Sequence, residues 1–172
     1  MDAIDIVFIL DASGSVSSYN FNLTKYFLSQ FVSGLDIDND HIRAVFVTYA
    51  SSVEERINLN LYSSRASFQP AISSLRYLAG SSNTAVALGY VRTEMLTSTA
   101  GDRSNVPDVI VLLTGGQSDD RRATEVCRVA WTVMYVVNFV KVCYNQRSTW
   151  YVGLNMQGQY TIGSHQCRIN TT

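Results

Sequence analysis

Two almost continuous apolar runs stand out in the chain, at residues 4–10 and 108–113. Both are rich in β-branched side chains, which is typical of strands buried on both faces of a parallel sheet that helices cover. Each run ends in small polar residues, at positions 11–15 after the first and 114–116 after the second. Because ligands of such sheets bind at the carboxyl ends of the strands, we expect the functional residues at these two turns.

Apolar residues at helical spacing predict the helices. Residues 21–32 place their apolar side chains on one helical face, and Gly34 follows as a stop signal. Residues 64–78 repeat the pattern, and a further helix carries the apolar positions between Ala87 and Met95.

Residues 42–49 and 53–61 predict two more strands. Residues 51–52 between them are too short for a crossover helix, so we expect an antiparallel hairpin. The order of elements along the chain is typical of an α/β fold. We therefore expect a mostly parallel sheet with helices on both faces and with residues 53–61 as its one antiparallel edge strand.

The pattern weakens from about residue 121. Residues 129–144 fit a helix, a strand or one of each, and residues 150–154 and 159–162 fit short strands. Residues 137–143 and 150–154 are the candidates for the last strands of the sheet. All three cysteines lie in this last third, and an odd number permits one disulfide with a leftover thiol in any pairing of Cys127, Cys143 and Cys167.

Composition narrows the class of protein. The 172 residues are 47% hydrophobic and 16% charged, which fits one domain with a buried core rather than a disordered chain. The net charge of −1 offers no basic excess for a nucleic-acid backbone, so we expect no nucleic-acid partner. The longest uncharged apolar stretch, residues 129–140, is shorter than the about 20 residues that span a bilayer, so we expect no membrane span in this chain.

The first polar turn carries the candidate chemistry. Asp11, Ser13 and Ser15 offer one carboxylate and two hydroxyls at alternate positions. Hard oxygen ligands of this kind suit Mg²⁺, which asks for few protein ligands. A plain alternative is that these residues only cap the next helix.

Two further segments add to the pattern, Ser82-Asn83-Thr84 before a helix and the strand that ends at Thr114. With these three motifs in order, the chain resembles the von Willebrand factor type A (vWA) domain family. It is most similar to the extracellular matrix type found in matrilins and non-fibrillar collagens. The resemblance covers about residues 4–125 of a single domain over residues 1–172, with residues 128–172 as a divergent tail.

The resemblance implies a doubly wound, Rossmann-like sheet and a metal-ion-dependent adhesion site. Its metal, Mg²⁺ or else Mn²⁺ or Ca²⁺, would be held by Asp11, Ser13, Ser15 and Ser82, with the supporting or alternative residues being Thr84, Thr114 and Asp119. An open coordination position would accept a carboxylate of the partner, an extracellular matrix protein such as collagen or another matrix component. The implied location is extracellular, as a secreted protein or as the extracellular part of a larger one.

Gly115 departs from the family, which has an aspartate after the threonine that ends this strand. The second acidic group is therefore missing, and Asp119 matches an acid that the family already has. Two hypotheses follow: an adhesion site whose metal binding is impaired, or a scaffold domain that binds without metal through another face. An enzyme is not expected, because the chain has no P-loop or Gly-x-Ser-x-Gly motif and neither His41 nor His165 lies beside a candidate nucleophile.

Overall fold

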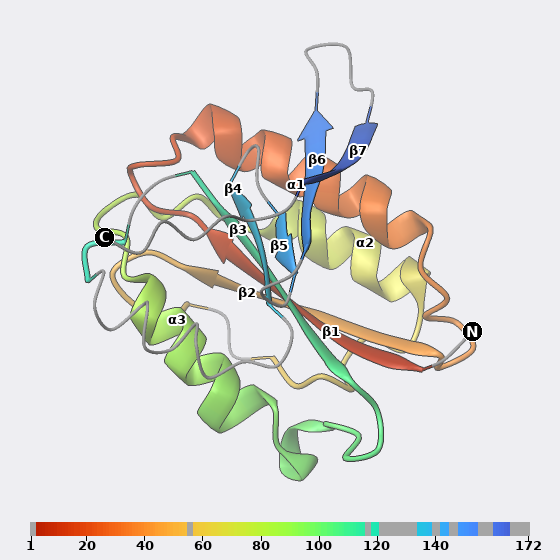
Figure 1. Ribbon diagram of the computed structural model, residues 1–172. Helices are drawn as coiled ribbons and strands as arrows, with labels where there is room; N and C mark the ends of the chain where they lie inside the picture. Colours follow the sequence, from red (N-terminus) through yellow and green to blue (C-terminus); the bar gives the residue numbers. More distant parts are fainter. Residues whose placement is uncertain are drawn as a thin grey trace, which may run out of the picture.

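The computed structural model describes residues 3–54, 57–115 and 118–120, together with the backbone of four later strands. A four-stranded parallel sheet forms the centre of the molecule, in the order β2-β1-β3-β4. Its strands are β1 (Ile4–Asp11), β2 (Ile42–Tyr49), β3 (Asp108–Thr114) and β4 (Met134–Asn138) (Figure 1). The two apolar runs of the sequence are thus neighbouring strands, as expected.

Strand β1 lies at the centre of the core because both of its faces are covered. Four consecutive side chains, from Val7 to Leu10, have no exposed surface. The helices α1 (Ser18–Ser33) and α2 (Arg65–Ser74) lie on one side of the sheet and α3 (Thr84–Tyr90) on the other (Figure 1). The expected α/β fold with a parallel sheet and helices on both faces is confirmed.

Polar side chains set the starts of the helices. Ser17, Ser64 and Asn83 each accept a hydrogen bond from a backbone N–H in the first turn of the helix that follows. The predicted helix at residues 21–32 is α1, which ends at Gly34. The predicted helix at 64–78 is α2, which is shorter and stops at Ser74.

The last predicted helix, carrying residues 87–95, is divided in the structure. It consists of α3 and a π-helical turn η1 (Val91–Met95), and a short 3₁₀ turn η2 (Ser98–Ala100) follows. This segment leads over the lower end of the sheet into β3 (Figure 1).

The expected antiparallel edge strand is reduced to one bridge, between Tyr49 and Val53. The prediction that this edge strand continues over residues 57–61 is wrong, because these residues form no strand. The N–H of Leu59 donates instead to the carbonyl of Ala100 at 2.7 Å. The alternation of apolar residues that suggested a strand reflects packing, since Leu59 is completely buried.

The later strands divide between two sheets. Strand β4 extends the parallel sheet beside β3. Strands β5 (Val142–Tyr144), β6 (Ser148–Leu154) and β7 (Tyr160–His165) form a separate antiparallel sheet. The predicted strands at 150–154 and 159–162 are therefore present in β6 and β7, but residues 150–154 do not extend the parallel sheet. The side chains of Cys127, Cys143 and Cys167 lie outside the described part of the chain.

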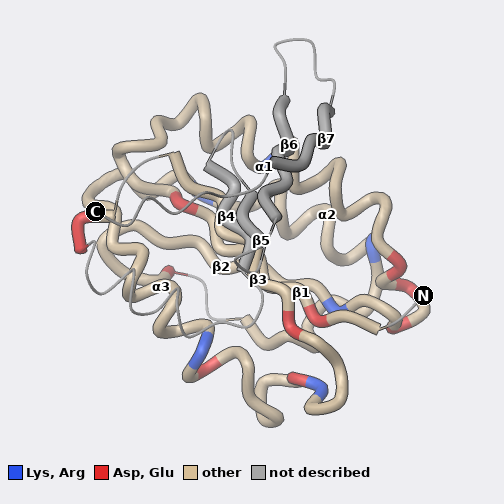
Figure 2. Tube along the Cα trace, in the orientation of Figure 1, with Lys and Arg blue, Asp and Glu red and all other residues tan. Residues whose placement is uncertain are grey.

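Two properties of the described residues concern the expected absence of nucleic-acid and membrane partners. Lysine and arginine positions are scattered along the trace rather than gathered on one face (Figure 2). Among the described helices, none has the length and apolar character needed to cross a bilayer.

Candidate functional site

Asp11, the last residue of β1, is the centre of the candidate site. Its side chain is almost fully buried, with 1% of the residue exposed. The backbone N–H of Ser13 donates to its Oδ1 at 3.0 Å. This bond closes the tight turn after β1, so the turn residues themselves orient the carboxylate.

The other carboxylate oxygen joins two distant segments. Oδ2 of Asp11 accepts the hydroxyl of Ser82 at 3.0 Å and the hydroxyl of Thr114 at 2.8 Å. Ser82 lies just before α3, and Thr114 ends β3. These two hydrogen bonds and the one from Ser13 offset the cost of burying the carboxylate. The structure thus brings Asp11, Ser82 and Thr114 into direct contact.

The serines of the first turn form a second pair of oxygens. Oγ of Ser13 lies 2.8 Å from Oγ of Ser15. Ser13 is completely buried and Ser15 is exposed, so the pair leads from the interior to the surface. The turn is also tied to the loop before Ser82, because the N–H of Gly14 donates to the carbonyl of Gly80 at 2.9 Å. A Cβ at position 14 would lie 3.2 Å from that carbonyl oxygen, so glycine permits the close approach.

Thr84 contacts a different partner from Ser82. Its hydroxyl lies 2.9 Å from the hydroxyl of Tyr49, and both side chains are buried. Burial, and then the negative charge of Asp11, raise the pKa of the Tyr49 hydroxyl. Tyr49 is a site residue that the sequence analysis missed. The available signal was its position at the end of β2, where it pairs in register with Asp11.

Asp119 supports Ser82 from the surface. Its Oδ2 accepts the N–H of Ser82 at 2.8 Å, and its own N–H donates to the carbonyl of Ser82 at 2.8 Å. Ser118 beside it accepts the N–H of Thr84 at 3.2 Å. The Asp119 carboxylate is therefore engaged with the backbone of the Ser82 loop.

Gly115 is exposed and directly follows Thr114. Its backbone is outside the left-handed region, which among the described glycines only Gly80 and Gly101 adopt. A Cβ at position 115 would lie 3.3 Å from Cγ2 and 3.4 Å from Cα of Val16, so a side chain there requires this buried valine to move by a few tenths of an ångström. The backbone conformation therefore does not require glycine here, and an aspartate at this position fits with that movement of Val16.

Comparison with known proteins agrees with this geometry. The family model described as the von Willebrand factor type A domain matches residues 5–156, which reaches further than the expected limit near residue 125. The collagen alpha-4(VI) chain of Mus musculus is 36% identical over 118 residues, covering 67% of this chain and 5% of that protein. Matrilin-1 of Mus musculus is 31% identical over 143 residues, covering 80% of this chain and 29% of that protein.

A solved structure is similar as well. Proximal thread matrix protein 1 from the mussel byssus, with a zinc-occupied MIDAS motif, has a TM-score of 0.66 and 26% identity, over 78% of this chain and 35% of that one. The chain spans less than a third of the length of the two curated relatives. The match over most of its length shows that the chain belongs to the von Willebrand factor type A domain family, with relatives of the extracellular matrix type.

Proposed function

We propose that this chain is an extracellular adhesion module that binds a matrix protein through the loops around Asp11. The observation that carries the proposal is the buried Asp11 carboxylate, on which the hydroxyls of Ser82 and Thr114 converge from separate loops. Membership of the vWA family supports a protein-binding role rather than catalysis. The proposed partner is collagen or another matrix component, and the proposed location is extracellular, either secreted or as part of a larger protein.

The oxygens of the site are of the type that a hard divalent cation binds, and one pair of them supports the proposal by its spacing. In an octahedral Mg²⁺ site with bonds of about 2.1 Å, neighbouring ligands lie about 3 Å apart. The 2.8 Å between the hydroxyls of Ser13 and Ser15 matches that spacing. Asp11 and Ser82 complete the proposed set of ligands, and Thr114 and Asp119 hold them in place. Mg²⁺, Mn²⁺ or Ca²⁺ bound there would offer its open position to a carboxylate of the partner.

A single carboxylate makes this a weak metal site. Gly115 contributes no charge where the family has an aspartate, so the ion loses one strong electrostatic partner. Both oxygens of Asp11 are also engaged by hydrogen bonds from protein groups, which favours the second candidate function. In that alternative the domain is a matrix scaffold that binds without metal through another face.

Calorimetric titration with Mg²⁺, Mn²⁺ and Ca²⁺, followed by binding to immobilised collagen with and without a chelator, separates the two functions. The adhesion site predicts partner binding that a chelator abolishes and that Ser13→Ala weakens. Ser81→Ala, at an exposed serine beside Ser82, is the matched control and should have no effect. Partner binding that survives both the chelator and Ser13→Ala would support the metal-independent scaffold instead.

A further inference from the structure

The outward face of α1 carries a stripe of exposed apolar and aromatic side chains. Tyr19, Leu23 and Tyr26 are 71%, 39% and 60% exposed. They follow one another at spacings of four and three residues, which places them on one face of the helix. Surface helices usually present charged residues on this face. The one charged residue of α1 is Lys25, whose Nζ donates to the carbonyl of Leu75 at 3.1 Å.

Asn22 lies inside this stripe and begins the sequon Asn22-Leu23-Thr24, the acceptor pattern for N-linked glycans. Its side chain is exposed. It follows Tyr19 by three residues and precedes Tyr26 by four, and residues at these spacings are neighbours on a helix surface. The asparagine is therefore flanked by two exposed aromatic rings, one on each side along the helix.

The third residue of the sequon is engaged in the fold. Thr24 is buried, and its hydroxyl donates to the carbonyl of Asn20 at 3.1 Å. An enzyme that recognises the sequon through this hydroxyl cannot reach it in the folded helix. Modification must therefore take place on the chain before α1 forms, and the folded domain needs only to leave room at Asn22, which its exposure provides.

We propose that Asn22 is an N-glycosylation site and that Tyr19 and Tyr26 form a platform for the first sugars of the glycan. In the reaction, the side-chain amide nitrogen of Asn22 bonds to C1 of N-acetylglucosamine and loses one proton. The bond from C1 to the phosphate oxygen of the donor, an oligosaccharide on a polyprenyl diphosphate, breaks, and the diphosphate leaves with the electron pair. The proposal rests on the extracellular location proposed above, because this donor belongs to the secretory pathway.

The platform follows from the chemistry of sugars and aromatic rings. One face of a pyranose ring is lined with C–H groups, and an aromatic ring has a negative face that attracts their partial positive charge. A sugar stacked on Tyr19 or Tyr26 removes apolar surface from water, while its hydroxyls stay hydrated. The glycan thus supplies the polar cover that the uncharged outer face of α1 lacks.

Secretion of the full chain from animal cells behind a signal peptide tests the modification. We expect a product that a glycan-releasing amidase shifts to lower mass, and peptide mass spectrometry should locate the glycan at Asn22. The peptide assignment is needed because Asn170-Thr171-Thr172 is a second sequon. Asn22→Gln and Thr24→Ala should abolish modification at position 22, whereas Thr24→Ser keeps the hydroxyl and should retain it.

Thermal unfolding tests the platform. We expect Tm of the glycosylated wild type to exceed that of Asn22→Gln by about 2–4 °C. With Tyr19→Ala and Tyr26→Ala combined, the same comparison should give less than about 1 °C. These exposed tyrosines can be removed without loss of the core. Val86→Ala, at an exposed apolar residue of α3, is the matched control and should keep the full difference.

Each outcome decides one part of the proposal. An unmodified Asn22 in the secreted protein overturns it, and weaker binding of Tyr19→Ala to immobilised collagen would then make the stripe a protein-binding face. A modified Asn22 whose effect on Tm survives in the double tyrosine variant overturns the platform. Ser13→Ala should still be glycosylated and Asn22→Gln should keep the Mg²⁺ affinity of the wild type, so failure here is distinguishable from failure of the adhesion site.

Discussion

The hydroxyl of Ser82 donates to Oδ2 of Asp11 at 3.0 Å, although the two residues are 71 positions apart in the chain. This bond joins the turn after β1 to the loop before α3. Both side chains are buried, so no solvent water can replace either partner in this hydrogen bond. The candidate site is therefore part of the core at its inner end and reaches the surface only through Ser15 and the loops around it.

Removal of the Ser82 hydroxyl should destabilise the domain measurably. Ser82→Ala deprives the buried Asp11 carboxylate of one partner, and we expect a loss of about 1–3 kcal/mol in the free energy of unfolding. Urea denaturation measures this loss. Ser81→Ala removes an exposed hydroxyl from the neighbouring residue and should change stability by less than about 0.5 kcal/mol. Equal effects of the two substitutions would show that the bond to Asp11 contributes nothing.

An aspartate at position 115 should restore strong metal binding. Gly115→Asp adds a negative charge beside Thr114, and we expect Mg²⁺ affinity to rise at least about tenfold, or about 1.4 kcal/mol. Gly115→Asn has nearly the same shape without the charge, so it controls for the contact with Val16. Titration calorimetry of the three proteins gives the comparison. If none of them binds Mg²⁺, the metal-dependent adhesion function is rejected.

The contact between Tyr49 and Thr84 should matter for stability more than for metal binding. Tyr49→Phe leaves the buried hydroxyl of Thr84 without this partner, and we expect a loss of about 1 kcal/mol in unfolding free energy. Tyr26→Phe, at a tyrosine that is 60% exposed, is the matched control. A drop in Mg²⁺ affinity for Tyr49→Phe as large as that for Ser13→Ala would instead make Thr84 part of the metal site.

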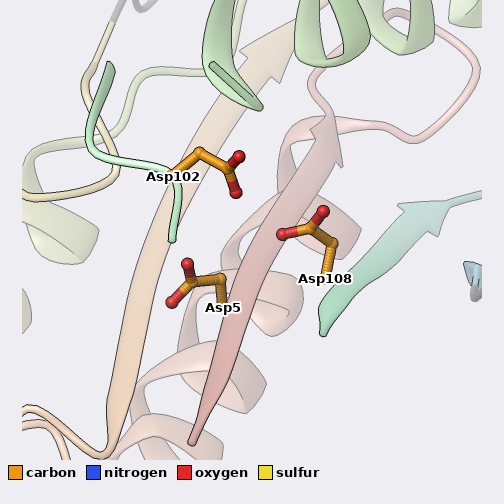
Figure 3. Close-up of side chains that lie close together, drawn as sticks. All are labelled: Asp5, Asp102 and Asp108. Carbon is orange, nitrogen blue, oxygen red and sulfur yellow. The ribbon is translucent and has the colours of Figure 1, made fainter. Parts of the chain in front are cut away.

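Stability should depend on the ionisation of Asp108. Burial, and then the charge of Asp102, raise its pKa in the folded protein to about 7 from the ordinary value of 3.8, so the folded state holds this proton more tightly than the unfolded state (Figure 3). The favourable contribution is complete below pH 3.8 and is lost as the pH rises to about 7. Urea denaturation across this range should show that Asp108→Asn removes that part of the pH dependence. An unchanged profile in the variant would contradict the assignment.

Sequence patterns alone predict the central strands and the first turn of the site. A continuous apolar run such as residues 4–10 is stable only with both faces covered, which implies a sheet between helices. The turn from Asp11 to Ser15 is local, and its polar residues at a strand end mark the functional edge. The resemblance to vWA domains adds Ser82, which no local pattern would connect to Asp11.

The sequence by itself therefore determined the strands that local apolar patterns define and the turn that follows the first of them. Only the tertiary structure decided which distant groups meet. Leu59 bonds to Ala100 rather than to a neighbouring strand, because its burial places its backbone beside that loop. Thr84 faces Tyr49, while Ser82 faces Asp11. The proximity of Asp5 and Asp108 is likewise a product of the parallel pairing of β1 and β3, which brings together two carboxylates about a hundred positions apart, and no pattern along the chain encodes that contact.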